Sequence, residues 1–227
     1  IVITGAGSGL GKSLTRRFTA DGDKVVLLGR RLSKLTELAD QIGDLALPIA
    51  CDIGKPESVR EAFAQIAARY PKIDVLINNA AMIDYSTIAD ASDEHILDTI
   101  ATNLTGNILC SRAALKMMER GGHIINVSSE SVEAPYPHHV VYQATKGGVE
   151  AMSRHFQDEV REQGIRVSVV RAGPMYGEDR TMERTPSVLA FYSACAERGI
   201  NLQKNPISEF NSVYWIFRSL VDMQYDR

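Results

Sequence analysis

The sequence opens on a short apolar run that leads into a glycine-rich turn and then into a helical pattern. Residues 1–4 have the length of a buried strand, and the turn reads Thr4-Gly5-x-x-x-Gly9-x-Gly11. Leu14 and Phe18 follow at helical spacing. Such a turn lets backbone amides approach a pyrophosphate, and the helix N-terminus favours negative charge. This order predicts the first unit of a dinucleotide-binding sheet. The alternative is a flexible glycine turn without a ligand.

The same alternation of strand-length runs and helical patterns continues along the chain. Strands are expected at 1–4, 24–28, 45–51, 73–77, 123–127 and 165–170, and helices at about 10–22, 33–42, 56–70, 92–119, 142–164 and 208–221. Ser33 is expected to cap the second helix, and the glycine pair 121–122 is expected to end the fourth. The pattern predicts an α/β fold, a Rossmann-type doubly wound parallel sheet in three layers. The length of 227 residues suits a single domain, 1–227.

Composition narrows the function classes. A net charge of −3 without a long basic run argues against nucleic-acid or membrane-surface binding, and no apolar run is long enough to span a bilayer. Cys51, Cys110 and Cys195 are widely spaced, as in a cytoplasmic protein with reduced, buried thiols. The histidines lack metal-site spacing, so no metal is expected, and His138 and His139 are expected on the surface of a loop. Residues are expected to be missing at both ends of the sequence.

The end of the second strand indicates which dinucleotide the site prefers. Gly29 is followed by Arg30 and Arg31, where an NAD site usually has an acidic residue. Arginine suits a 2′-phosphate, so NADP(H) is preferred and NAD(H) is the alternative. The two arginines would otherwise only begin a solvated helix. Asp52, after the third strand, is expected either to bind an adenine amino group or to cap the helix that begins near Pro56.

Tyr142 and Lys146 lie four residues apart on a predicted helix, so both side chains share one face. A free tyrosine has a pKa of about 10, and a neighbouring ammonium lowers the pKa of a phenol. Tyr142 is therefore a candidate general acid or base. Ser129 follows the fifth strand, at the edge where ligands of parallel sheets bind. Asn103 is unusual inside a helix, which suggests either an internal hydrogen bond or a polar group delivered to the site beside a kink.

Together these motifs resemble the short-chain dehydrogenase/reductase (SDR) family over nearly the whole chain. The resemblance rests on the glycine turn, Asp52, Asn78-Asn79-Ala80, Asn103, Ser129 and Tyr142-x-x-x-Lys146, in the family's order and spacing. It implies that Ser129 binds the substrate oxygen and that Tyr142 exchanges its proton. It implies further that Lys146 lowers the tyrosine pKa and binds the nicotinamide ribose, while Asn103 holds a water between Lys146 and solvent. The expected cofactor contacts are Gly5, Ser8, Gly9, Leu10, Gly11, Arg30, Arg31, Asp52, Ile53, Asn79, Ala80, Tyr142, Lys146, Gly173 and Met175.

The sequence departs from the family pattern at several positions. Ala81 stands where the family has glycine, and Ala172-Gly173 replaces the usual Pro-Gly. The threonine expected near Gly177 is absent, as are the last strand and glycine pair. These departures affect the nicotinamide amide contacts more than the catalytic residues. Family members commonly form dimers or tetramers through the helices around Asn103 and after Tyr142, so a homodimer or homotetramer is expected.

The sequence therefore predicts an oxidoreductase that transfers a hydride between NADP(H) and a small carbonyl or secondary alcohol. The alternatives are a dinucleotide-sensing protein without turnover, and an epimerase or dehydratase on the same fold. Residues 175–205 are expected either to form a substrate lid or to pack on the core. The pocket is expected to involve Met82, Glu130, Glu133 and Tyr136. The sequence does not identify the substrate.

Overall fold

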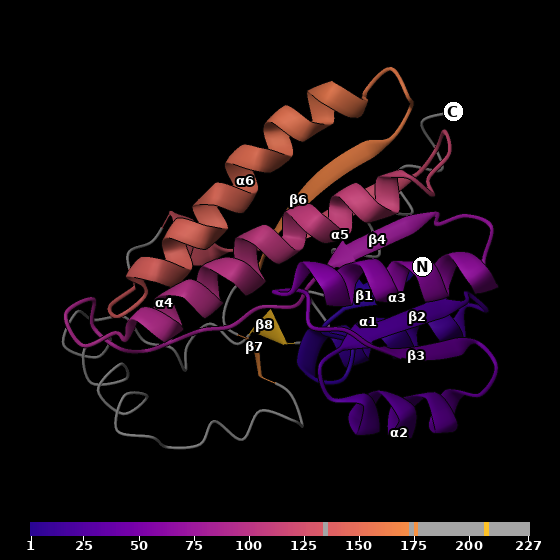
Figure 1. Cartoon of the computed structure of the whole chain (residues 1–227), viewed down its shortest axis with the longest axis horizontal. Helices are drawn as coiled ribbons and strands as arrows, with labels where there is room; N and C mark the ends of the chain where they lie inside the picture. The colour runs from indigo at the N-terminus through magenta and orange to yellow at the C-terminus, as the bar shows by residue number, and fades with distance from the viewer. Residues whose placement is uncertain (134–135, 173–174, 177–206, 209–227) are drawn as a thin grey trace.

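A parallel sheet of six strands lies at the centre of the computed structural model, which describes residues 1–133, 136–172, 175–176 and 207–208 (Figure 1). The strand order is β3-β2-β1-β4-β5-β6, and all neighbouring pairs are parallel. The strands are β1 (Val2–Thr4), β2 (Val25–Gly29), β3 (Ala46–Ala50), β4 (Val75–Asn78), β5 (His123–Ser129) and β6 (Arg166–Ala172). The Rossmann-type doubly wound sheet that the sequence predicts is confirmed.

The strands are apolar because both faces of the sheet are covered. Val26 and Leu28 belong to one buried cluster, whereas Val25 and Leu27 belong to the cluster on the opposite face. Successive side chains of a strand point to opposite faces, so a strand buried on both sides needs a continuous apolar run.

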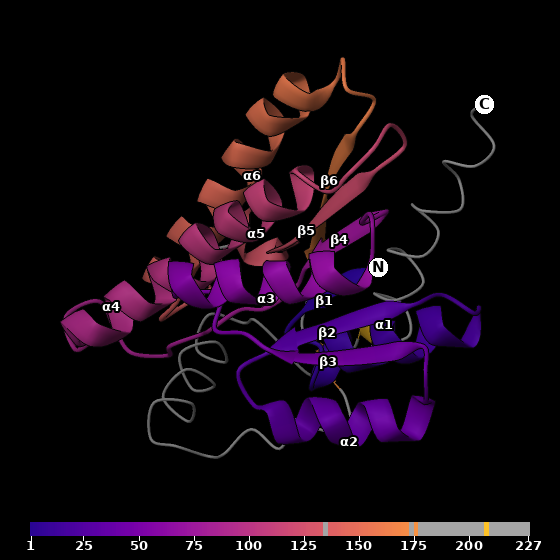
Figure 2. The same ribbon diagram turned by 45° about the vertical axis from the view of Figure 1, so that its right-hand side comes forward.

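Helices form the outer two layers. They are α1 (Gly9–Ala20), α2 (Leu32–Ile42), α3 (Pro56–Arg69), α4 (Asp93–Ile100), α5 (Gly106–Leu115) and α6 (Val140–Val160). Buried side chains of α1 and α2 join one cluster, and those of α3 and α5 join the other. Figure 2 shows α2 on one side of β2 and β3, and α3 on the other. No helix among the described residues is long and apolar enough to cross a membrane.

The segment expected as one helix over 92–119 is divided into three parts. The π-helical turn η1 (Ala101–Thr105) separates α4 from α5, and α5 ends at Leu115 rather than at the glycine pair 121–122. A π turn contains one more residue than an α turn and is frequent at functional sites. Gly106 follows the π turn and packs closely against Ile53. A Cβ added to Gly106 would lie 2.7 Å from the Ile53 carbonyl oxygen.

Other boundaries also differ from the expectation. The N-cap of α2 is Arg31, so Ser33 lies inside the first turn and does not cap the helix. Ser208, expected to begin the last helix, belongs to β8 (Ile207–Ser208), which pairs in parallel with β7 (Met175–Tyr176). Residues 177–206, most of the expected lid, and 209–221, the rest of that helix, lie outside the described residues.

Candidate active site

The glycine turn after β1 packs against the segment that leaves β4. Gly5 has φ +67° and Gly9 has φ +50°, a conformation that glycine adopts readily. A Cβ on Gly5 would lie 2.9 Å from Ala80 Cα, and one on Gly11 would lie 2.3 Å from the Gly5 carbonyl oxygen. Glycine at these positions therefore allows the backbone to form a close-fitting turn at the N-terminus of α1, which is the geometry that a pyrophosphate needs.

Thr4 joins this turn to the segment after β4. Its Oγ1 accepts hydrogen bonds from the backbone amides of Asn79 (2.9 Å) and Ala80 (3.0 Å). The Asn79 Nδ2 donates in return to the Thr4 carbonyl oxygen at 2.9 Å. β1 and β4 are the strands between which the strand order reverses, where dinucleotides bind in sheets of this class.

The other expected cofactor contacts lie along the same edge of the sheet. Arg30 and Arg31 follow β2 and are exposed, and Ser8 is the N-cap of α1. The side chains of Leu10 and Ile53 are buried in the core, so only their backbones can contact a ligand.

Asp52 follows β3 and organises the turn before α3. Its Oδ1 accepts a hydrogen bond from the Gly54 amide at 3.1 Å, and its own amide donates to Ser58 Oγ at 3.0 Å. The N-cap of α3 is Lys55, so Asp52 is not the helix cap that was one of its two expected roles.

Asn103 is buried in the π turn and joins the segment after β4 to α6. Its Oδ1 accepts from the Met82 amide at 2.7 Å, and its Nδ2 donates to the Met82 carbonyl oxygen at 2.8 Å. The same Nδ2 lies 3.2 Å from Thr145 Oγ1, next to Lys146 on α6. The expected internal hydrogen bonds are therefore present, and they connect the segment after β4 to the helix that carries Tyr142.

Lys146 lies under Tyr142 and is only 2% exposed. Its Nζ donates to the Val127 carbonyl oxygen at 2.7 Å and lies 5.6 Å from the centroid of the Tyr142 ring. Burial lowers the pKa of Lys146 to about 8. Since that value is still above 7, the ammonium is the main form at neutral pH, and its positive charge acts on the Tyr142 ring.

Ser129 is the last residue of β5 and is 9% exposed. Its Oγ accepts a hydrogen bond from the Ser131 amide at 3.2 Å, and it lies 2.9 Å from Ser131 Oγ. Both contacts belong to the short 3-10 turn η2 (Glu130–Val132). A hydroxyl, a phenol and an ammonium thus come from β5 and α6, two neighbouring elements at the carboxyl edge of the sheet.

Comparison with known proteins identifies the family of this chain. Residues 1–187 match the short chain dehydrogenase family. The chain belongs to this family. The family assignment made from the sequence motifs is therefore confirmed, and this short-chain dehydrogenase is an oxidoreductase.

Its relatives include the NADP-dependent 3-hydroxy acid dehydrogenase YdfG of Escherichia coli strain K12, which is 32% identical over 219 residues, covering 95% of this chain and 88% of the relative. The farnesol dehydrogenase of Aedes aegypti is 29% identical over 183 residues, covering 76% and 75% of the two chains. Among solved structures, a closed form of serine dehydrogenase complexed with NADP+ superposes with a TM-score of 0.80 at 28% identity, covering 96% of this chain and 88% of the other. A short-chain dehydrogenase from Streptomyces avermitilis gives a TM-score of 0.85 at 26% identity and covers 96% and 82%.

In this short-chain dehydrogenase, Tyr142 also has aromatic neighbours. The His139 ring lies 5.6 Å from that of Tyr142 and nearly perpendicular to it, and 5.4 Å from the ring of Tyr85. His139 is buried, so the expectation that it lies on the surface is wrong. Burial lowers its pKa, and its Nδ1 lies 2.8 Å from the Pro137 carbonyl oxygen. His138 is half-buried and has φ 59°. The burial of His139 was missed because it depends in part on contact with Tyr85, which is remote in the chain.

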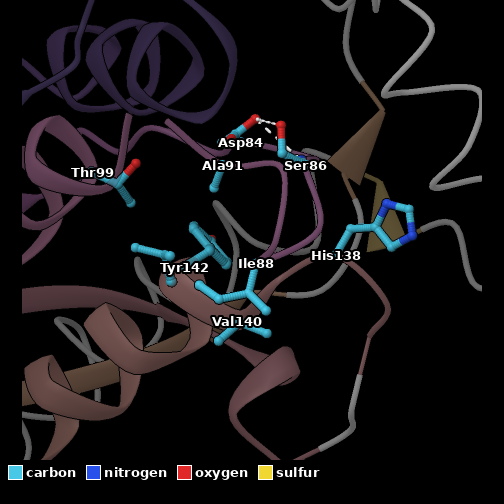
Figure 3. Close-up of a pocket in the computed structure, with 9 residues that line it drawn as sticks. Asp84, Ser86, Ile88, Ala91, Thr99, His138, Val140 and Tyr142 are labelled. Atoms are coloured by element: carbon cyan, nitrogen blue, oxygen red, sulfur yellow. Dashed lines mark hydrogen bonds between the residues drawn. The ribbon is translucent and has the colours of Figure 1, made fainter. Parts of the chain in front are cut away.

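A small pocket lies beside Tyr142, between the loop that follows β4 and the start of α6 (Figure 3). Ile88 and Val140 form its apolar side. Asp84 and Ser86 form a polar side, and a hydrogen bond of 3.0 Å joins their side chains.

Met82, Glu130, Glu133 and Tyr136, which were expected in the substrate pocket, do not line this cavity. The Tyr136 hydroxyl donates a hydrogen bond to Glu130, and Glu133 forms an ion pair with Arg171. The backbone of Met82 is hydrogen-bonded to the Asn103 side chain. Nothing in the sequence of the loop over 84–91 indicated that it lines a pocket.

A buried carboxylate ties α6 to the sheet near the site. Glu150 receives hydrogen bonds from Arg171 Nε (2.8 Å), Arg171 Nη2 (2.7 Å) and Ser128 Oγ (2.8 Å). The guanidinium lowers the pKa of Glu150. Sequence reasoning missed this pair because nothing in the chain marks two residues so far apart as partners.

The last two expected cofactor contacts and the cysteines lie partly outside the described residues. Gly173 lies outside the described residues, and Met175 is part of β7. Cys51 and Cys110 are buried, and burial raises the pKa of both thiols, that of Cys51 to about 11, whereas Cys195 is not among the described residues. Over the described part of the chain, no three His, Cys, Asp or Glu side chains form a group that could hold a metal ion.

Proposed function

We propose that this short-chain dehydrogenase interconverts a small carbonyl compound and the corresponding secondary alcohol with NADP(H). The observation that carries the proposal is the position of Lys146, which lies 5.6 Å from the Tyr142 ring and donates to the Val127 carbonyl oxygen of β5, the strand that ends at Ser129. Asn103 is connected to the same helix by its hydrogen bond to Thr145, the neighbour of Lys146.

The roles follow from the chemistry of each group. Ser129 binds the substrate oxygen, and Tyr142 exchanges a proton with that oxygen. The Lys146 ammonium favours the phenolate form of Tyr142, because opposite charges attract strongly where water is largely excluded. When bound, the nicotinamide cofactor supplies or accepts the hydride, and the protein supplies alignment and charge.

The residues along the cofactor edge fit a phosphorylated dinucleotide. Gly5 and Gly11 have no room for side chains, and the exposed Arg30 and Arg31 can pair with a 2′-phosphate. The relative from Escherichia coli is named as NADP-dependent, and the superposed serine dehydrogenase was solved with NADP+. NAD(H) is the alternative cofactor.

Replacing Tyr142 with phenylalanine tests the proposal. Tyr142→Phe removes the proton donor and keeps the ring that packs on His139, so turnover should fall by about 10²–10⁴, the usual contribution of a general acid or base. The measurement is NADPH oxidation against a panel of carbonyl compounds, together with NADPH binding by fluorescence titration. Binding should stay close to that of the wild type. Full turnover in the variant would refute the role of Tyr142.

The rival functions predict other results in the same assay. A dinucleotide-sensing protein would bind NADPH and oxidise none of it, and an epimerase or dehydratase would convert substrate without net change in NADPH. The hydroxyl, phenol and ammonium group favours the oxidoreductase, since a sensor needs none of them.

We also propose that the protein is a homodimer or homotetramer in the cytoplasm, with one domain over 1–227 and a lid near 175–205. Exposed apolar side chains on α4 and α5, among them Leu97 and Ile108, support an interface on these helices. The substrate is proposed to enter beside Tyr142, next to the pocket formed by the loop over 84–91.

A further inference from the structure

Ser131 stands two residues after Ser129 and makes two contacts with its side-chain oxygen. The Ser131 amide donates to Ser129 Oγ at 3.2 Å, and the two hydroxyl oxygens lie 2.9 Å apart. Over the described residues, Ser129 Oγ has no other hydrogen-bond partner than Ser131. The oxygen proposed to bind the substrate is therefore held by one neighbouring residue.

Burial determines which of the two hydroxyls donates. Ser131 is 2% exposed, and among the described residues Ser129 Oγ is the acceptor within reach of its hydroxyl. If Ser129 donated to Ser131, the Ser131 proton would be buried without an acceptor, which is costly. Ser129 is 9% exposed, at the end of β5, and its own proton can point outward. Ser131 is thus the donor and Ser129 the acceptor.

The acceptor capacity of Ser129 is then used up. A serine oxygen has two lone pairs and one proton, and Ser131 occupies the two lone pairs through its amide and its hydroxyl. The one bond that Ser129 can still make is the donation of its own proton. An oxygen that accepts two hydrogen bonds is also a stronger donor, because hydrogen bonds in a chain polarise one another.

We propose that Ser131 is a positioning residue that fixes Ser129 as a hydrogen-bond donor toward the substrate oxygen. Ser129 then offers no lone pair to a substrate hydroxyl, so Tyr142 is the group that exchanges the proton. Gln143, next to Tyr142 on α6, donates its side-chain amide to the Ser131 carbonyl oxygen. The backbone of Ser131 therefore connects the turn that holds Ser129 to the helix that holds Tyr142. This inference rests on the proposed function.

Ser131→Ala removes the hydroxyl and keeps both backbone contacts. We expect kcat to fall about tenfold, as for the loss of one hydrogen bond to a reacting group, with the KM for NADPH within about twofold of the wild type. Ser131→Cys keeps a side chain of similar shape with a poor donor and should lose a similar factor, which separates the hydrogen bond from the effect of a cavity. Ser153→Ala is the matched control. Its hydroxyl is equally buried on α6 but contacts Asn126 and Val149, so kcat should not change.

A double-mutant cycle distinguishes positioning from a merely structural role. If Ser131 acts through Ser129, then Ser131→Ala added to Ser129→Ala should change the residual kcat less than twofold. The residual rate is measured by end-point assays over hours at high enzyme concentration. An equal loss in both backgrounds, or a kcat of Ser131→Ala within twofold of the wild type, would overturn the inference. Full activity of Ser129→Ala would instead overturn the role of Ser129 in the proposed function.

Discussion

Lys146 shows how strongly one residue depends on its surroundings. A lysine this deeply buried would lose its charge in a purely apolar site, yet its Nζ donates to the Val127 carbonyl oxygen and its pKa remains about 8. The backbone of β5 thus supplies an acceptor for the buried ammonium next to Tyr142. The proximity of the ammonium to the phenol was predictable from the spacing of Lys146 and Tyr142. The hydrogen bond to the Val127 carbonyl oxygen was not, because a backbone acceptor leaves no mark in the sequence.

Arg30 supports a prediction about cofactor choice. Arg30→Asp places a carboxylate at the end of β2, where it would repel a 2′-phosphate and could accept hydrogen bonds from a ribose hydroxyl. We expect affinity for NADPH to fall about ten- to a hundredfold, the value of a charge-assisted hydrogen bond, and NADH to be less affected. Fluorescence titration with both cofactors measures this. Arg69→Asp, at the C-terminus of α3 and the opposite edge of the sheet, is the control. Unchanged relative affinities in Arg30→Asp would reject the assignment.

At the scale of elements, the strands were predictable because each is a continuous apolar run, and most are followed by a helical pattern. The π turn was not. One additional residue in a helix hardly disturbs the apolar periodicity over 92–115, and only the polar Asn103 indicated a local irregularity. The ends of helices, including the cap of α2 and the end of α5, depend on local backbone geometry and were also missed.

Gly106 allows a test of the π turn. Gly106→Ala would push a methyl group against the Ile53 carbonyl oxygen, so the free energy of unfolding should fall by about 1–3 kcal/mol. Turnover should fall as well, because Asn103 lies in the displaced turn. Urea unfolding and steady-state assays measure both effects. Gly147→Ala is the control, since among the described residues no atom beyond its own helix backbone lies within 4 Å of its added Cβ, and it should stabilise the helix by about 0.5–1 kcal/mol. Equal stability of Gly106→Ala and wild type would contradict the packing argument.

At the scale of the whole molecule, the arrangement of the site depends on topology. Ser129, Tyr142 and Asn103 belong to separate elements, and the sheet brings them together because the carboxyl ends of parallel strands share one edge. The roles proposed for them come from the family resemblance. The pairing of Glu150 with Arg171 and the burial of His139 were not, since both depend on contacts that form only after the elements pack.

The proposed oligomer gives a prediction at the same scale. Leu97 is 65% exposed on α4, and Leu97→Glu would place a charge in an apolar interface, weakening association at least tenfold. Light scattering after size-exclusion chromatography should show a smaller particle than the wild type. Leu32→Glu is the control, because Leu32 is also exposed (46%) but lies on α2. This variant should leave the mass of the particle unchanged. A wild-type protein that elutes as a monomer would exclude the interface.

The three hydrogen bonds between Thr4 and the segment 79–80 have a consequence for cofactor affinity. They fix the backbone after β1 and the backbone after β4, on both sides of the expected cofactor site, while the chain folds and before a dinucleotide binds. The conformational entropy of these two segments is lost in folding, so little remains to be lost on association. The cofactor should therefore bind at a rate that does not depend on a preceding rearrangement of the glycine turn.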